Sequence, residues 1–380
     1  MKKIYLDNAA TTKVDKKVIG AMLPFFDKKY GNASSLHSFG RESRGALEKA
    51  REIIKKKLSA YGYQIIFTSG GTEANNFAIK GIAFANKHKG NHIITTQIEH
   101  ECILNSCRWL ETQGFSVTYL PVDREGFVKK EELAKAIRKD TILVSIIHGN
   151  NEIGTIQNLR DLGRICKEKK VYFHTDACQS FTKVPIDLLK DNVDLITINS
   201  HKINGPKGVG ALVIRDGIEI EPLLHGGGQE KGLRSSTENI PGSVGFGKAV
   251  EISSYKDSIK IEKIRNYLIR KVIEIKNVKL NGPMKNRLCN NVNVSFKNIE
   301  GESVVLYLDK KGIAVSTGSA CSSKSLEPSH VLIAIGLKPE EAHGGIRISI
   351  SKETTKKEID YTIKILKKAV GFLRGLSPFV

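Results

Sequence analysis

The stretch TILVSIIH, residues 141–148, holds an almost unbroken apolar run that is rich in β-branched side chains. A run of this length and composition is typical of a strand that is buried on both faces of a parallel sheet. We therefore assign residues 141–148 to a central strand, and the flanking sequence shows what kind of sheet surrounds it.

Short apolar runs alternate with helical patterns on both sides of this strand. Further strands are expected at residues 65–68, 92–95, 116–120, 171–176, 194–199 and 210–215. Helices are expected between them at residues 72–86, 101–113, 130–137 and 159–169. This alternation predicts an α/β fold with a mostly parallel, seven-stranded sheet and helices on both of its faces.

The pattern changes after about residue 253. A long charged helix is expected at residues 259–275, followed by strands at 278–280, 292–296 and 346–350 and helices at 303–309 and 356–374. This arrangement predicts a smaller α+β domain with its own sheet. We expect a large domain over residues 16–257 and a small domain formed by residues 1–15 together with 258–380.

Composition narrows the classes of function. The chain has 60 Lys and Arg against 40 Asp and Glu, a formal charge of +20, which favours anionic partners. The lysines are spread through helical segments without a basic arm, so direct nucleic-acid binding is not expected. No run of about 18 apolar residues and no signal peptide are present, which predicts a cytoplasmic protein with no membrane span. Six cysteines form no C-x-x-C pair or zinc spacing, so no metal site is predicted.

Two polar clusters follow strands in the large domain. The first, TSGGTE (residues 68–73), could hold a phosphate at the start of a helix, or it could be a tight turn capped by Thr72. The second, HTDACQ (residues 174–179), places Asp176 at a strand end, where its carboxylate could hold a proton on the ring nitrogen of a cofactor. Asp176 could equally cap the next helix.

A third cluster, NSHK (residues 199–202), presents Lys202 at the mouth of the buried sheet, where a neutral amine could form a Schiff base. A fourth, STGSACSS (residues 316–323), has the composition of a mobile loop, and it makes Cys321 a candidate nucleophile. Arg347 could hold a substrate carboxylate with two hydrogen bonds. Because ligands bind beyond the carboxyl ends of such strands, these clusters point to one site.

Taken together, these motifs resemble the cysteine desulfurases of the NifS/IscS group, class-V aminotransferase-like enzymes that depend on pyridoxal 5'-phosphate (PLP). The resemblance spans essentially the whole chain, through the segments TSGGTEANN, HGNNEIG, TDACQS, SHK, GPKGVGAL, HGGGQEKGLRSSTEN, STGSACSS and LEPSHVL. It implies the PLP-dependent transferase fold type I. It also implies that L-cysteine is converted to L-alanine while the sulfur passes to Cys321 as a persulfide.

The resemblance assigns roles to individual residues. Lys202 would carry PLP as a Schiff base, Asp176 would pair with its pyridine nitrogen, and His100 would stack on its ring; Cys321, Lys202 and His100 would be catalytic. Other implied cofactor contacts are Gly71, Thr72, Asn151, Gln179 at the phenolic oxygen, Asn199, His201 and, from the second subunit of a homodimer, Thr237. Asn151 and Arg347 would bind the substrate carboxylate. The sulfur acceptor would be an iron–sulfur scaffold or a tRNA-thiolation enzyme, and the sequence does not choose between them.

The chain departs from the group in places. Asn199 stands where Ser is usual, and Ser236 replaces a frequent Gly. A selenocysteine lyase or a small aminotransferase is the nearest alternative, although an aminotransferase would not need Cys321. An inactive sulfur carrier or RNA-associated protein on the same scaffold is disfavoured by the intact Lys202 and Asp176. A nucleotide-binding Rossmann protein is excluded because no G-x-G-x-x-G follows the first strand.

Overall fold

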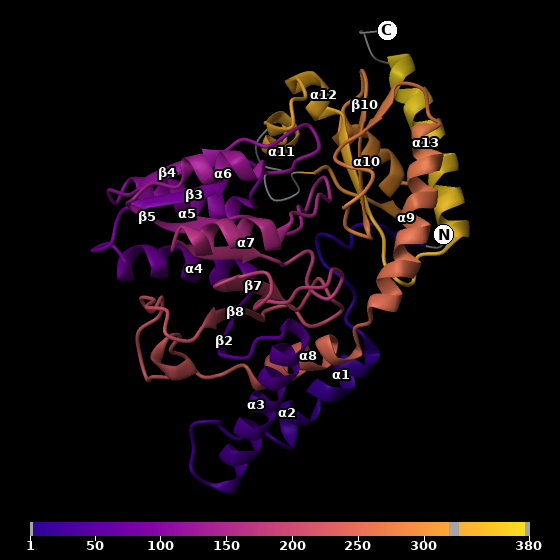
Figure 1. Ribbon diagram of the computed structural model, residues 1–380. Helices are drawn as coiled ribbons and strands as arrows, with labels where there is room; N and C mark the ends of the chain where they lie inside the picture. Colours follow the sequence, from indigo (N-terminus) through magenta and orange to yellow (C-terminus); the bar gives the residue numbers. More distant parts are fainter. Residues whose placement is uncertain (1–2, 319–326, 377–380) are drawn as a thin grey trace.

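The computed structural model describes residues 3–318 and 327–376 and has a larger and a smaller body (Figure 1). The larger body contains a seven-stranded sheet in the order β2-β8-β7-β6-β5-β3-β4. Its strands are β2 (Tyr63–Thr68), β3 (His92–Thr96), β4 (Ser116–Leu120), β5 (Thr141–Ser145), β6 (Tyr172–Asp176), β7 (Leu195–Asn199) and β8 (Gly210–Arg215). Only β8 runs against its neighbours, so the predicted mostly parallel sheet is confirmed.

Helices cover both faces of this sheet, as the strand–helix alternation predicts. One face packs against α3 (Ser38–Leu58), α6 (Lys130–Ala136), α7 (Leu159–Glu168) and α8 (Ile240–Ile252). The other face packs against α4 (Gly71–Ala85) and α5 (Glu101–Glu111). Successive residues of β2 divide between the two cores: Ile65 and Phe67 join the first, and Ile66 joins the second. Each fully buried side chain of this kind contributes about 1.5–3 kcal/mol.

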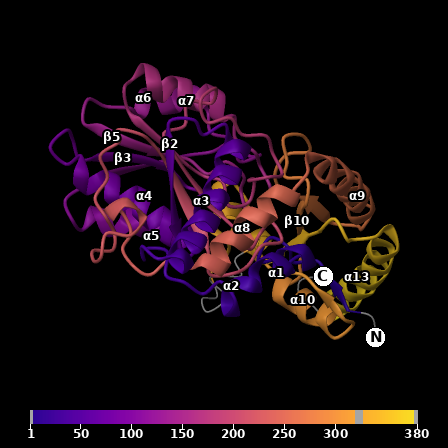
Figure 2. The same ribbon diagram turned by 90° about the horizontal axis from the view of Figure 1, so that it is seen from below.

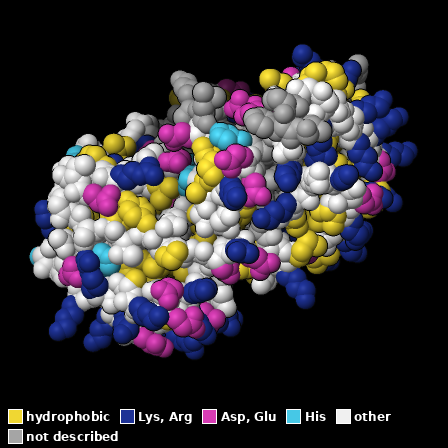
Figure 3. Space-filling model, turned by 90° about the horizontal axis from the view of Figure 1, so that it is seen from above, with side chains coloured by type: hydrophobic (Ala, Val, Ile, Leu, Met, Phe, Trp, Pro, Cys, Tyr) yellow, Lys and Arg dark blue, Asp and Glu magenta, His cyan; other side chains and the backbone are white. Residues whose placement is uncertain are grey.

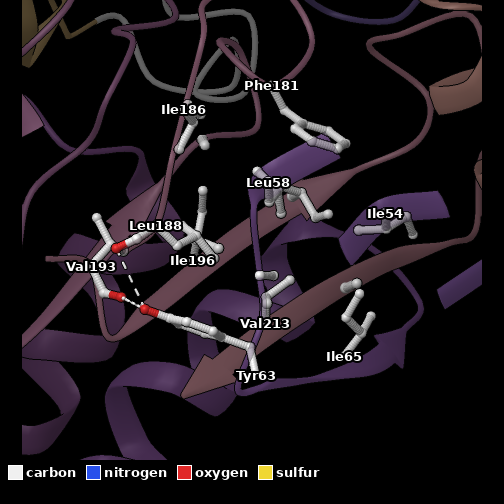
Figure 4. Packing of buried hydrophobic residues seen from close by; sticks show 14 of the residues in the cluster. Ile54, Leu58, Tyr63, Ile65, Phe181, Ile186, Leu188, Val193, Ile196 and Val213 are labelled. Carbon is white, nitrogen blue, oxygen red and sulfur yellow. Dashed lines mark hydrogen bonds between the residues drawn. The ribbon is translucent and has the colours of Figure 1, made fainter. Parts of the chain in front are cut away.

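Tyr63 shows how a polar group is accommodated in the first core. Its ring is 2% exposed beside Leu58, Ile65 and Val213 (Figure 4). Its hydroxyl donates to the carbonyl of Val193 at 2.7 Å, which satisfies the buried oxygen. The start of β2 is thereby joined to the turn that precedes β7.

The smaller body has its own antiparallel sheet in the order β12-β10-β9, with a short parallel pair beside it. Its strands are β1 (Ile4–Tyr5), β9 (Val278–Leu280), β10 (Asn291–Phe296), β11 (Ile313–Ala314) and β12 (Gly345–Ser349), and its main helices are α9 (Tyr255–Ile273), α10 (Gly301–Asp309) and α13 (Lys356–Leu376). Figure 2 shows these helices gathered on one side of the molecule. One hydrophobic core joins Ile4 and Leu6 to residues 268–370. The proposed boundaries at 15/16 and 257/258 stay a prediction.

A small apolar cluster joins the two bodies. It combines Ile98, Ile147 and Ile153 of the larger body with side chains from α11 (His330–Ala334), α12 (Pro339–His343) and the turn between them. The remaining helices, α1 (Lys16–Met22) and α2 (Pro24–Asp27), lie beside α3 and α8 at the far end of the larger body (Figure 1). The described part of the chain has no helix with the length and apolar character of a membrane span.

The central strand ends earlier than the sequence indicates. β5 stops at Ser145 instead of at residue 148. The N–H groups of Ile146 and His148 nevertheless still donate to carbonyls of β6, those of His174 and Asp176. The apolar run therefore continues along β6 as irregular backbone, and it leads directly into the loop that carries Asn151.

Candidate active site

A cavity of about 260 Å³ opens where the strands of the large sheet end. It brings together residues that are far apart in the sequence, and ten of the predicted site residues line it: Gly71, Thr72, His100, Asn151, Asp176, Gln179, Asn199, His201, Lys202 and Arg347. Thr237 does not line it but borders a separate hollow of about 230 Å³. Cys321 lies outside the described residues, although Gly318, near it in the sequence, lines the cavity.

The start of α4 forms one wall. Helix starts present N–H groups that have no partner within the helix, and this end of α4 borders the cavity through Gly71 and Thr72. A Cβ on Gly71 would lie 2.6 Å from the sulfur of Cys178 and 3.5 Å from Nδ2 of Asn199. The contact with Cys178 therefore requires glycine at this position, whereas the distance to Asn199 is an ordinary van der Waals contact. The wall can receive an anion such as a phosphate.

Asp176 is held firmly at the end of β6. Its side chain accepts from Nδ2 of Asn75 at 2.7 Å and from the backbone N–H of Cys178 at 2.8 Å. Because Asp176 is only 4% exposed, these bonds fix the direction of its carboxylate. Asn75, which the sequence reasoning missed, lies three residues after Thr72 on α4, and this helical spacing within TSGGTEANN could have indicated it.

His100 is the N-cap of α5, and this position fixes its hydrogen bonding. Nδ1 accepts from the backbone N–H of Cys102 at 3.2 Å and lies 3.1 Å from the Cys102 sulfur. Burial lowers the pKa of His100, and the charge of Lys202 lowers it further. The neutral ring is therefore favoured, and its proton belongs on Nε2 because Nδ1 is an acceptor.

The last residue of β7 and the turn after it supply three more lining residues, Asn199, His201 and Lys202. Burial, with the charges of Lys202, Lys207 and Lys183, lowers the pKa of His201 to about 4, so this ring is neutral near pH 7. Asn199 is 3% exposed, and its Oδ1 has no hydrogen-bond partner among the described residues. Lys202 lies between two hollows, because it also lines a second one beside Lys183.

Lys183 is a second amine that sequence reasoning did not single out. Its Nζ donates to the carbonyls of Gln179 at 2.8 Å and Lys202 at 3.2 Å. Burial lowers its pKa to about 8. Lys183 thus supports the backbone of two lining residues from behind, whereas Lys202 lines the cavity itself.

Arg347, from β12, forms the opposite wall with the loop after β5. Its guanidinium donates to the carbonyl of Asn151 at 3.1 Å and to the carboxylate of Asp7 at 3.0 Å. The side chain is 4% exposed, and its Nε has no partner among the described residues. Asp7 was not predicted as a site residue, and it lies 340 residues before Arg347 in the sequence. This wall combines a cation with polar groups and can hold a carboxylate.

The donor set fits PLP. The cavity offers an amine for an aldehyde, a buried carboxylate for a ring nitrogen, a neutral imidazole and a helix start for a phosphate. Gln179 contributes an amide, one donor of which is bonded to the carbonyl of Ala9 at 2.8 Å. The Oδ1 atoms of Asn199 and Asn75, which have no hydrogen-bond partner in the described part of the chain, add polar groups that a bound cofactor or water can satisfy.

Comparisons with known proteins agree with this site. The chain matches the family Aminotransferase class-V over residues 4–362. It is 54% identical to cysteine desulfurase IscS of Dictyoglomus turgidum, across 100% of this chain and 97% of that protein. Two similar solved structures are a NifS-like protein and SspA in complex with cysteine. The first has a TM-score of 0.92 at 42% identity and covers 98% of this chain and 100% of its own. The second has a TM-score of 0.84 at 40% identity and covers 93% of this chain and 100% of its own.

Family, fold and cavity are consistent with one another over almost the whole chain. The relatives carry the name cysteine desulfurase, and enzymes of this family depend on PLP. The chain therefore belongs to the class-V aminotransferase family and, within it, to the PLP-dependent cysteine desulfurases of the IscS and NifS type.

Proposed function

We propose that the chain converts L-cysteine to L-alanine and takes up the sulfur as a persulfide on Cys321. The observation that carries this proposal is the single cavity in which Lys202, Asp176, His100 and Arg347 meet. Bound PLP would supply an electron sink that eases loss of the substrate's α-proton. Asp176 would hold the ring nitrogen, and Gly71, Thr72, Asn199 and His201 would hold the phosphate.

The protein's own groups would bind the substrate and move its protons. Arg347 and Asn151 would hold the carboxylate, so that the α-carbon faces Lys202. Lys202 would anchor the cofactor and, once the substrate amine has replaced it, its free amine would accept the α-proton. His100 would donate a proton from Nε2, because its Nδ1 already accepts a hydrogen bond from the backbone N–H of Cys102 at the start of α5.

In the sulfur step, the Cys321 thiolate would attack the sulfur of the substrate. A sulfur–sulfur bond forms while the Cβ–S bond breaks, and the electron pair left on Cβ takes up a proton to complete the methyl group of alanine. The atoms of L-cysteine and the thiol thus balance those of alanine and the persulfide, without an external oxidant or reductant.

The described cysteines support Cys321 as the acceptor. Burial raises the pKa of Cys102 to about 12, which leaves almost no thiolate at neutral pH. Burial likewise raises the pKa of the other described thiols, those of Cys107, Cys166, Cys178 and Cys289. These five cysteines are therefore poor nucleophiles in the folded chain.

The test is a single incubation with L-cysteine and PLP. We expect alanine and protein persulfide in equal amounts, with the persulfide mapped to Cys321 by mass spectrometry. Cys321→Ala should bind PLP yet form no persulfide, whereas the control Cys166→Ala, on the buried face of α7, should behave as the wild type. Full turnover in Cys321→Ala would favour an aminotransferase instead. The absence of alanine even with PLP and a strong reductant would refute the activity.

We further propose a homodimer that completes the site. Thr237 lies three residues before the start of α8 at Ile240, and α8 packs against α3. Large apolar side chains are exposed on α2 and in the loop after it. Phe26, Tyr30 and Leu36 are 64%, 68% and 83% exposed. A second copy that covers these side chains would bring its Thr237 toward the cavity. Phe26→Glu should shift the mass measured by light scattering from dimer to monomer.

We propose a cytoplasmic enzyme whose acceptor is an iron–sulfur scaffold or a tRNA-thiolation enzyme. The charge of +20 favours an acidic acceptor. Figure 3 shows Lys and Arg spread over one face among Asp and Glu, so charge would promote encounter more than it would define a single docking patch. Transfer of labelled persulfide sulfur to each kind of acceptor, measured side by side, would decide between them.

A further inference from the structure

Glu152 is a buried carboxyl group in the cavity wall that the proposed reaction does not use. It is 3% exposed, and it follows Asn151 in the loop after β5. Its backbone is tightly held: its N–H donates to Oδ1 of Asn150 at 2.9 Å, and its carbonyl accepts from Nδ2 of Asn291 at 3.0 Å. The side chain therefore starts from a rigid position.

The carboxyl group of Glu152 contacts the chain on both sides of residues 319–326. On one side, its Oε2 accepts from the hydroxyl of Ser329 at 2.5 Å. That hydroxyl oxygen also accepts from the N–H of Leu332, so its single proton is committed to Glu152. On the other side, a Cβ on Gly318 would lie only 2.2 Å from Oε2, so the carboxyl group packs directly against the Gly318 backbone.

The same wall holds the proposed substrate anchor. Arg347 donates to the carbonyl of Asn151, the residue before Glu152, and its backbone pairs with Ser316 through hydrogen bonds of 2.7 and 3.1 Å. Burial raises the pKa of Glu152 more than the hydrogen bond from Ser329 and the charges of His330 and Arg347 lower it. The hydrogen bond from Ser329 and the packing against Gly318 are the contacts that form this junction.

We propose that Glu152 is a positioning residue. It joins Gly318 and Ser329, which lie on either side of the segment that contains Cys321, to the wall that holds the substrate carboxylate. This inference rests on the proposed function, because it concerns delivery of Cys321 to the substrate sulfur. Loss of the junction should slow sulfur transfer while substrate binding stays intact. An error of about 1 Å in the position of a reacting group can cost on the order of a hundredfold in rate.

The test uses the PLP-loaded enzyme in single-turnover reactions with L-cysteine. Glu152→Ala should form the Cys321 persulfide at least about tenfold more slowly. Glu152→Gln, which can still accept from Ser329 and carries no charge, should stay within about threefold of the wild type. The matched control Glu327→Gln, an exposed carboxylate two residues before Ser329, should leave the rate unchanged.

Binding of L-alanine, followed by the absorbance of the cofactor, separates positioning from general damage. Alanine has the amine and carboxylate of the substrate but no sulfur, so its affinity should stay within about twofold in Glu152→Ala. Unchanged persulfide formation in Glu152→Ala would overturn the inference, as would an equal loss of alanine affinity. If the wild type itself forms no persulfide on Cys321, it is the proposed function that fails.

Gly318→Ala gives a second test that does not depend on Glu152→Ala folding well. Its new methyl group should displace the Glu152 carboxyl group and slow persulfide formation by a similar factor. In the Glu152→Ala background, where that space is free, Gly318→Ala should not slow persulfide formation any further. Losses that simply multiply in the double variant would contradict the junction.

Discussion

The two walls of the cavity are built in different ways. The cofactor wall, with Asp176, Asn199 and Lys202, comes from the ends of neighbouring strands in one sheet and from the turns that follow them. The substrate wall depends on pairs that are distant in the sequence, such as Asp7 with Arg347 and Glu152 with Ser329. The first wall is rigid because the sheet is rigid, whereas the second is as rigid as the contact between the two bodies.

This difference predicts how the walls respond to substitution. Changes at the cofactor wall should abolish chemistry without moving the bodies, because the sheet maintains the geometry. Changes at the substrate wall should alter substrate affinity or the rate of sulfur transfer by smaller factors, because several contacts together hold this wall in place. Variants at each wall can test this contrast directly.

The largest effect is expected at Lys202. Lys202→Ala removes the proposed anchor and base, and turnover should fall by at least about a thousandfold. Lys183→Met changes the neighbouring buried amine, which supports the backbone but does not line this cavity, and it should cost no more than about tenfold. Steady-state alanine formation and the absorbance of bound PLP measure both. Equal losses in the two variants would mean that the two amines are not distinct in role.

A smaller effect is expected at Asp7, on the substrate wall. Asp7→Ala leaves the buried Arg347 without its carboxylate partner, so the guanidinium loses its fixed orientation. KM for L-cysteine should rise about tenfold with kcat nearly unchanged, and Asp7→Asn, which keeps an acceptor, should show a smaller rise. Initial rates over a range of cysteine concentrations give both constants. A fall in kcat at constant KM would place Asp7 in the chemical step instead.

The two walls also differ in how far the sequence predicts them. Strand ends meet at one edge of a parallel sheet, so the positions of TSGGTE, HTDACQ and NSHK along the chain are enough to indicate a common site. Nothing local to Asp7 or Glu152 indicates a partner that is 340 or 177 residues away. The helix α3 also received no sequence assignment, although His37 caps it and its buried positions, such as Leu47, Ile54 and Leu58, follow helical spacing.

Glu99 is a fully buried residue that contacts both bodies, and it gives a pH-dependent test of the packing between them. Its side chain accepts from the N–H of Ile147 at 2.8 Å, and its backbone carbonyl lies 2.9 Å from Nε2 of His330. Burial raises the pKa of Glu99 from 4.5 to about 8. A raised carboxyl pKa contributes stability that is complete below about pH 4.5 and is lost as the pH rises through 8.

The Gln side chain in Glu99→Gln cannot ionise. Between pH 5 and pH 8.5, the melting temperature of the wild type should therefore fall relative to that of this variant. The free-energy difference at stake is on the order of a few kcal/mol, which corresponds to several degrees. Thermal unfolding of the PLP-bound proteins at both pH values measures it. Glu327→Gln serves as the exposed control, and its melting temperature should differ from that of the wild type by the same small amount at both pH values. A constant difference between the wild type and Glu99→Gln would show that Glu99 does not titrate in this range.

The smallest effect is expected at Ser236, beside the residue proposed to complete a second subunit's site. Ser236 has a φ of 151°, a backbone conformation that favours glycine. Ser236→Gly should therefore stabilise the protein by about 1 kcal/mol or less, with turnover unchanged. Ser235→Gly is the matched control: Ser235 is buried and accepts from the N–H of Gly228 at 3.3 Å, so its loss should destabilise. Thermal unfolding of both variants tests this. A higher melting temperature for Ser236→Gly together with a lower one for Ser235→Gly would indicate backbone strain at Ser236. Equal shifts in the two variants would exclude that strain.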